Sequence, residues 1–265
     1  MKIAIIGAGA MGEALLAGWL AAGQDAATIC FVEPVDERAA HIRDTWGITR
    51  VQLADAATAA TIVLAVKPQY VAEALRAIRP TRDSLVVSIA AGVPLATIEV
   101  AAPGVPTVRV MPNTPALVGK GMAAVAPGTH ATPDHTARVV ELMQAVGKAI
   151  VVPEYQLDAV TAVSGSGPAY LFYLAEAMIE AGVHLGLARA DATTLVHQTL
   201  LGSATMLDEV GETATVLREK VTSPAGTTAA ALGVMDDRGV RAAMIAALRA
   251  ARDRGLEMAS ADSRR

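Results

Sequence analysis

Short apolar runs alternate with amphipathic stretches along the first half of the chain. The runs are KIAIIG (2–7), TICFVE (28–33), TIVLAV (61–66), SLVVSIA (84–90) and PTVRVM (106–111). Nearly continuous apolar runs of this length are typical of strands in a parallel sheet that is covered on both faces. Helical patterns such as 11–22 and 71–78 lie between them. This alternation predicts a doubly wound α/β domain.

The same pattern continues to about residue 153. The segments MAAVA (122–126) and AIVV (149–152) are strand-like and could extend the sheet. Residues 131–147 between them are expected to form a helix, with Thr132 as N-cap, Pro133 at the first helical position and Gly147 past the end.

From Asp158 onward the pattern becomes helical, with no convincing strand. The expected helices cover residues 168–185, 191–209, 226–235 and 238–259. Their apolar positions extend around much of each helix, which favours packing against a second subunit. We therefore expect an α/β domain over residues 1–153 and an all-helical dimerisation domain over residues 154–265, giving at least a homodimer.

Composition narrows the functional classes. Of the 265 residues, 53% are hydrophobic, 18% are charged and the formal net charge is −4, with no basic block that would indicate nucleic-acid binding. The most continuous apolar stretch, Ala56–Val66, is shorter than the roughly 20 residues of a membrane span. The single cysteine, Cys30, excludes an internal disulfide and fits a reducing cytosol, so a cytoplasmic protein is expected.

The segment GAGAMG, Gly7–Gly12, directly follows the first predicted strand and begins a predicted helix. In this context Gly7 allows a tight turn, Gly9 lets the backbone approach a pyrophosphate, and Gly12 lets helix and strand pack closely. With Ala8, Ala10 and Met11, these glycines form the predicted dinucleotide-binding loop of a Rossmann-type domain. A plain glycine turn is the weaker alternative.

Two residues near the end of the second predicted strand bear on the coenzyme. Glu33 lies where an acidic side chain can accept a hydrogen bond from the adenosine ribose 2′-hydroxyl of NAD. Arg38, five residues later, could instead serve the 2′-phosphate of NADP. Both could also be ordinary surface charges, so the choice between NAD(H) and NADP(H) stays open.

Other candidate cofactor-binding residues follow later predicted strands, where open α/β sheets bind ligands. They are Ala65, Val66, Lys67 and Pro68 in AVKPQ, Ala90, Ala91 and Gly92 in SIAAGV, and Asn113 in MPNTPA. Ordinary turn chemistry is the alternative for each of them.

Two segments of the helical half combine glycine with hydroxyl residues: SGSGPAY (164–170) and TSPAGTT (222–228). In TSPAGTT, Ser223 is expected to be an N-cap and Pro224 the first helical residue. The backbone N–H groups of residues 225–227 would then bind a carboxylate or phosphate. A simple capped helix start is the alternative. The five histidines form no metal-binding pair, so no metal is expected.

Taken together, GAGAMG, AVKPQ, SIAAGV, MPNTPA, SGSGPAY and TSPAGTT resemble the pyrroline-5-carboxylate reductase family over essentially the whole chain. The resemblance implies a Rossmann domain followed by a helical dimerisation domain. It also implies reduction of 1-pyrroline-5-carboxylate, a cyclic imine acid, to L-proline with NADH or NADPH.

The resemblance further implies roles for individual residues. Thr228 would be the catalytic residue, bonded to the ring nitrogen of the substrate. The predicted substrate-binding residues are Ser164, Ser223, Ala225, Gly226, Thr227 and Thr228. Family members commonly read S-P-G-G where this chain has Ser223–Gly226, and we expect Ala225 to adopt a helical φ at which alanine is harmless.

Two alternatives remain open. A β-hydroxy acid dehydrogenase of similar architecture would carry a catalytic lysine on its helical domain, but Lys220, the only lysine after Lys148, precedes Thr222. A non-catalytic nucleotide-sensing protein would bind coenzyme without turnover, and it would need no carboxylate site.

Overall fold

The computed structural model of the chain describes residues 2–262 and divides into two compact units. The first unit comprises Met1–Ser166 and Ala250–Arg265, and the second comprises Gly167–Arg249. The first compact unit therefore continues past the expected boundary at residue 153. Residues 263–265 of the expected second domain lie outside the described residues.

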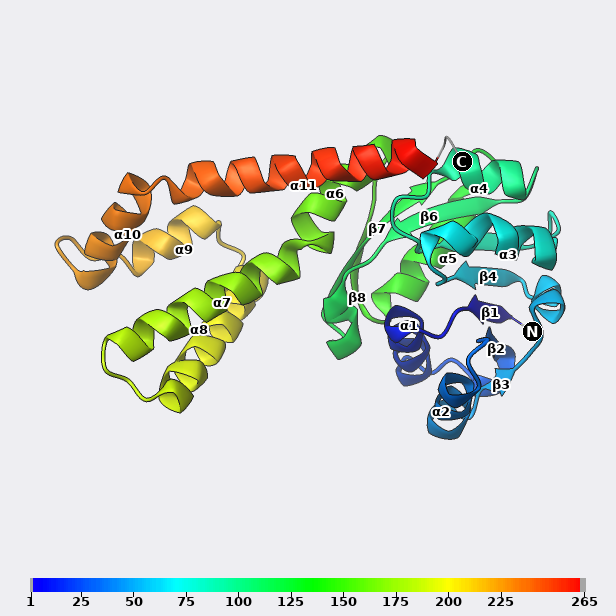
Figure 1. Cartoon of the computed structure of the whole chain (residues 1–265), viewed down its shortest axis with the longest axis horizontal. Helices are drawn as coiled ribbons and strands as arrows, with labels where there is room; N and C mark the ends of the chain where they lie inside the picture. Colours follow the sequence, from blue (N-terminus) through cyan, green and yellow to red (C-terminus); the bar gives the residue numbers. More distant parts are fainter. Residues whose placement is uncertain (1, 263–265) are drawn as a thin grey trace. The chain divides into compact units, whose positions relative to one another are not determined.

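An eight-stranded sheet forms the first unit, in the order β3-β2-β1-β4-β5-β6-β7-β8 (Figure 1). The strands are β1 (Ile3–Ile6), β2 (Ile29–Val32), β3 (Thr49–Arg50), β4 (Thr61–Leu64), β5 (Leu85–Ser88), β6 (Thr107–Met111), β7 (Gly121–Pro127) and β8 (Gly147–Val151). All neighbouring pairs are parallel except β6 and β7. The predicted doubly wound sheet and its extension by two further strands are confirmed.

Alternate residues of the buried strands pack on opposite faces of this sheet. In β1, Ile3 and Ile5 belong to a core with α1 (Ala10–Ala21), α2 (Asp36–Trp46) and α5 (Pro133–Gln144). Residues Ala4 and Ile6 belong to a second core with α3 (Val71–Ile78) and α4 (Leu95–Ala101). Burial on both faces explains why the strands read as continuous apolar runs.

The predicted start of α5 is confirmed, and its predicted end needs a correction. Thr132 Oγ1 accepts a hydrogen bond from the His135 backbone N–H, and His135 Nδ1 accepts one from the Thr132 N–H, both at 3.2 Å. The helix ends at Gln144, whereas Gly147 already belongs to β8. Gly147 has φ +153°, and a Cβ there would lie 2.0 Å from the Gly121 carbonyl oxygen. Close approach of β7 and β8 therefore explains this glycine.

The second unit is helical, as predicted. Its helices, the last of which continues into the first unit, are α7 (Gly167–His184), α8 (Arg189–Glu209), α9 (Ala214–Lys220), α10 (Thr227–Asp237) and α11 (Val240–Asp262). Large apolar side chains on α7 and α8 are exposed in the single chain, including Phe172 (66%) and Leu201 (62%). Such surface is expected of helices that pack against another subunit. No helix within the described residues is long and apolar enough to cross a membrane.

A buried arginine joins three parts of the first unit. Arg109 in β6 is 7% exposed, and its Nη1 lies 3.0 Å from Glu154 Oε1. The same oxygen accepts a hydrogen bond from the Leu95 backbone N–H at 2.6 Å. The Glu154 carboxylate therefore connects β6, the start of α4 and the turn after β8.

The variant Glu154→Ala is expected to lower the free energy of unfolding by about 1–3 kcal/mol, because it leaves Arg109 buried without its partner. Urea denaturation measures this change. Glu141→Ala removes a carboxylate from the exposed Arg138–Glu141 pair and should cost less than about 1 kcal/mol. Equal losses in the two variants would contradict the proposed role of Glu154.

Candidate active site

The three glycines of GAGAMG differ in what surrounds them. Gly7 has φ +93°, and a Cβ there would lie 2.8 Å from the Ala65 carbonyl oxygen. A Cβ at Gly12 would lie 2.4 Å from the Gly7 oxygen, whereas one at Gly9 would meet no atom within 4 Å. The fold therefore requires Gly7 and Gly12 but not Gly9. Open space beside Gly9 fits the close approach of a dinucleotide pyrophosphate.

The start of α1 provides hydrogen-bond donors at this point. Gly9 is the N-cap, and no side chain caps the helix. The Glu13 N–H donates to the Gly9 oxygen at 2.9 Å, so the N–H groups of Ala10, Met11 and Gly12 precede the first helical bond. Such groups, together with the helix dipole, suit phosphate oxygens.

A cleft of about 260 Å³ lies at the carboxyl ends of the central strands. Its lining residues are Met11, Ala65, Val66, Lys67, Pro68, Ile89, Ala90, Ala91, Met111 and Pro112. Seven of them are predicted cofactor residues from three separate segments. The other three (Ile89, Met111 and Pro112) were missed, although each adjoins or lies close to a predicted residue. Gly92 does not line the cleft; its φ of +77° serves the turn after β5.

Glu33 and Arg38 both form hydrogen bonds with the backbone of Ala8. Glu33 is 9% exposed; its Oε2 accepts from the Ala8 N–H and its Oε1 from the Val35 N–H, each at 3.0 Å. Arg38 Nε donates to the Ala8 oxygen at 2.7 Å, and its Nη2 pairs with Glu13. Glu33 follows β2 and Arg38 lies in α2, so both side chains stabilise the conformation of the glycine loop.

Glu13 also fastens α1 to α2. Burial raises the pKa of its carboxyl group, but hydrogen bonds from Trp46, His41 and Arg38 outweigh burial and lower the pKa overall. The carboxylate is ionised at neutral pH. Because the folded-state pKa of Glu13 is lowered, its ionised carboxylate stabilises the fold at pH values above the ordinary pKa. This contribution is lost as the pH falls through the lowered pKa.

The predicted residues Asn113 and Ser164 are hydrogen-bonded to each other. Asn113 Nδ2 donates to the Ser164 carbonyl oxygen at 3.0 Å, and its Oδ1 accepts from the Met122 N–H at 2.8 Å. Ser164 lies in a π-helical turn, Thr161–Gly165, and its hydroxyl donates to the Val160 oxygen at 3.0 Å. Asn113 thus connects the loop after β6 to this turn.

The TSPAGTT segment differs from its prediction. The helix α10 begins at Thr227 with Gly226 as N-cap, so the assignments of Ser223 as N-cap and Pro224 as first helical residue are wrong. Ser223–Gly226 instead form a tight turn, with a 3.0 Å bond from the Gly226 N–H to the Ser223 oxygen. Ala225 has φ +57°, so the expectation of a helical φ is also wrong. Proline followed by a residue of positive φ is typical of a type II turn.

The later start of α10 changes which backbone N–H groups are available to bind an anion. The Gly226 N–H is used in the turn, and the first helical bond runs from the Ala230 N–H to the Gly226 oxygen at 3.1 Å. The N–H groups of Thr227, Thr228 and Ala229 precede that bond and have no side-chain cap. Ala229 therefore joins the candidate anion site, and sequence reasoning missed it because it placed the helix start too early.

Replacing Ala225 with glycine is expected to stabilise the protein. A left-handed residue with a Cβ costs about 1–2 kcal/mol, and the extra freedom of glycine in the unfolded chain offsets about 0.4–1 kcal/mol of the relief. Thermal unfolding should therefore show a small increase in Tm. The control Ala231→Gly in α10 should lower Tm, since glycine weakens a helix by about 1 kcal/mol. A decrease for Ala225→Gly would show that Ala225 is unstrained.

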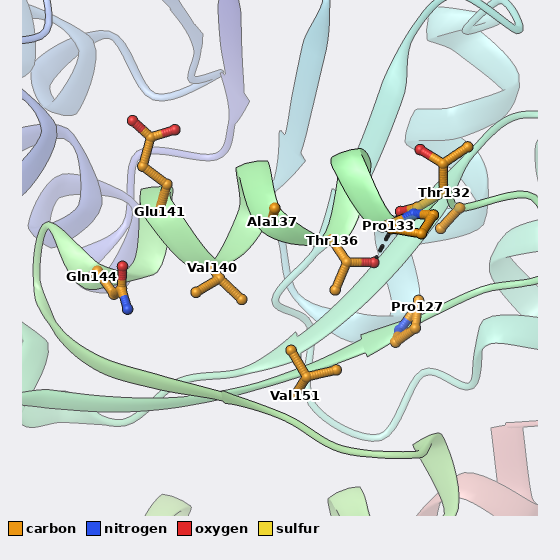
Figure 2. Close-up of a pocket in the computed structure, with 10 residues that line it drawn as sticks. Pro127, Thr132, Pro133, Thr136, Ala137, Val140, Glu141, Gln144 and Val151 are labelled. Atoms are coloured by element: carbon orange, nitrogen blue, oxygen red, sulfur yellow. Dashed lines mark hydrogen bonds between the residues drawn. The ribbon is translucent and has the colours of Figure 1, made fainter.

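A larger hollow, of about 560 Å³, lies elsewhere on the first unit. Figure 2 shows Thr136, Ala137 and Val140 of α5 on one side, with Val151 and Pro127 opposite. The lining is mainly apolar and includes no basic side chain among the described residues, so it offers little to a dinucleotide.

Two further observations concern the alternative chemistries. Within residues 2–262, no group of three or more His, Cys, Asp or Glu residues is placed to hold a metal ion. Lys220, the candidate acid or base of a β-hydroxy acid dehydrogenase, has its Nζ 2.6 Å from Glu212 Oε1.

Family models match both parts of the chain. Residues 154–258 match the family described as pyrroline-5-carboxylate reductase dimerisation, and residues 2–92 match NADP oxidoreductase coenzyme F420-dependent. The pyrroline-5-carboxylate reductase of Corynebacterium melassecola is 45% identical, over 97% of this chain and 98% of that protein.

Solved structures give the same relationship. A pyrroline-5-carboxylate reductase from Coxiella burnetii superposes with a TM-score of 0.93 at 35% identity, covering 97% of this chain and 98% of the other. A Plasmodium falciparum pyrroline carboxylate reductase with NADP bound gives 0.86 at 28% identity, covering 98% of each chain. The likeness extends over both the sheet and the helical part.

Proposed function

This chain belongs to the pyrroline-5-carboxylate reductase family, and we propose that it reduces 1-pyrroline-5-carboxylate to L-proline with NADH or NADPH. One observation on the chain itself carries the proposal. Two helices, α1 and α10, begin at glycine N-caps without a capping side chain, at Gly9 and Gly226. The reaction needs two anion sites, one for the coenzyme pyrophosphate and one for the substrate carboxylate.

The first site holds the coenzyme. The loop Gly7–Gly12 binds the pyrophosphate through the N–H groups at the start of α1, and the cleft lined by residues 65–68 and 89–91 holds the nicotinamide half. Bound coenzyme supplies the hydride. Glu33 and Arg38 keep the loop in shape through Ala8. Asn113 positions the loop after β6 through its hydrogen bond to the Ser164 oxygen, and Gly92 allows the turn after β5.

The second site holds the substrate. The N–H groups of Thr227, Thr228 and Ala229 bind the carboxylate, and the turn of Ser223, Ala225 and Gly226 shapes the approach to them. The Thr228 hydroxyl, in the first turn of α10, donates to the ring nitrogen or relays a proton to it. A protonated C=N bond accepts a hydride at carbon more readily, and orientation of that carbon supplies much of the rate.

The helical unit supports the assembly of several copies of this chain. The match to a dimerisation family and the exposed apolar side chains of α7 and α8 support a homo-oligomer. We propose a homodimer as its smallest form, able to assemble further. A cytoplasmic location is proposed because the one cysteine, Cys30, is buried and unpaired.

A coenzyme-oxidation assay at 340 nm tests this function. Purified protein is given NADH or NADPH with either pyrroline-5-carboxylate or a β-keto acid. We expect oxidation with the imine and none above background with the keto acid. Oxidation with the keto acid alone would support a β-hydroxy acid dehydrogenase, and coenzyme binding without turnover would support a nucleotide sensor.

A further inference from the structure

Glu33 and Arg38 were expected to determine the preference for NADH or NADPH, but both side chains already form other hydrogen bonds. Both carboxylate oxygens of Glu33 accept backbone hydrogen bonds, and the side chain is largely buried. The Arg38 guanidinium bonds to the Ala8 oxygen and to Glu13. A 2′-phosphate could recruit Arg38 only by breaking contacts that hold the glycine loop. A different group at the end of β2 must therefore respond to the phosphate.

The next charged side chains at this edge are Asp36 and Arg50. Asp36 is the first residue of α2, three residues after Glu33, and its side chain is 90% exposed. Arg50 comes from β3, where it pairs in register with Phe31 of β2. Its Nη1 lies 2.8 Å from Asp36 Oδ1, and its Nη2 donates to the Pro34 oxygen at 3.4 Å. An arginine thus lies across the loop that follows β2, where the adenosine ribose of a Rossmann coenzyme binds.

We propose that the Asp36–Arg50 pair sets the coenzyme preference of this enzyme, an inference that rests on the proposed coenzyme site. Arg50 can bind a 2′-phosphate through its planar guanidinium, whereas Asp36 repels that phosphate and competes for Arg50. The ribose 2′-hydroxyl of NADH meets no such repulsion and can donate to Asp36. The intact pair therefore favours NADH, and loss of the Asp36 charge favours NADPH.

The test is a titration of each coenzyme by its own fluorescence, without substrate, at low and high salt. Asp36→Asn should tighten NADPH binding by up to about fivefold, the worth of an exposed ion pair, and leave NADH binding nearly unchanged. Arg50→Met should weaken NADPH binding by about 10- to 100-fold without weakening NADH. The NADPH effects should shrink at high salt.

The matched control is Asp44→Asn, which removes the same charge from the exposed Arg43–Asp44 pair near the other end of α2. It should leave both dissociation constants unchanged. An unchanged ratio of the NADH and NADPH constants in both Asp36→Asn and Arg50→Met would overturn the proposal, as would an equal shift in the control. Because the titration needs no turnover, its result is independent of whether pyrroline-5-carboxylate is the substrate.

Discussion

Replacing Thr228 with alanine is expected to lower kcat/KM for pyrroline-5-carboxylate by about 10²–10⁴-fold, the usual range for a proton-transfer residue. The variant removes the hydroxyl proposed to act on the ring nitrogen. It keeps the backbone N–H that the carboxylate uses, so KM should change less than kcat. Steady-state kinetics with saturating coenzyme measures both parameters.

The control for this variant is Thr194→Ala. Thr194 is an exposed helical threonine in the same unit, and its hydroxyl donates to the Ala190 oxygen at 3.0 Å. We expect it to leave kcat/KM nearly unchanged. Unaltered kinetics in Thr228→Ala would remove Thr228 from the mechanism, and an equal loss in the control would attribute the effect to structure.

Gly9→Ala should fold normally but bind coenzyme at least about tenfold more weakly. A methyl group at this position meets no protein atom within 4 Å, yet it occupies the space proposed for the pyrophosphate. Isothermal titration with NADH and NADPH measures the loss, and an unchanged Tm shows that the fold is retained.

Gly12→Ala, in contrast, should lower Tm and serves as the comparison. Its Cβ would lie 2.4 Å from the Gly7 oxygen, so the loop or α1 must shift. Such overpacking costs about 1–3 kcal/mol, which thermal unfolding detects. Unchanged coenzyme affinity in Gly9→Ala would refute the assignment of the pyrophosphate to this helix start.

The sheet was predictable because its strands are buried on both faces. Each of the seven apolar runs overlaps a strand, from Ile3–Ile6 to Gly147–Val151. The strand Thr49–Arg50 was not predicted, since two exposed residues carry no periodic signal. Gly147 was interpreted as the glycine that follows a helix end. The structure explains this glycine by its close approach to Gly121, which is distant in sequence.

The TSPAGTT segment shows a limit of local rules. Ser-Pro is a good helix start by capping preference, yet here it forms a turn that precedes the helix. The positive φ of Ala225 has no signature in this sequence, because alanine rarely adopts it. Only the glycine common at this position in the family hinted at the turn.

The coenzyme residues show a different limit. The sequence suggested that Glu33 or Arg38 contacts the adenosine ribose or its 2′-phosphate, but it could not show that both side chains hydrogen-bond to Ala8. The contact of Arg50 with Asp36 joins positions 14 residues apart and depends on the pairing of β2 with β3. The sequence analysis did not predict that pairing, because it did not predict the short edge strand β3.

The proposed reaction is tested most directly by following the transferred hydride. Pyrroline-5-carboxylate is incubated with the protein and coenzyme carrying two deuterium atoms at nicotinamide C4, and the product is analysed by mass spectrometry and NMR. We expect L-proline with one deuterium, located on ring carbon 5. Unlabelled proline, or coenzyme oxidation without proline, would contradict direct hydride transfer to the C=N carbon.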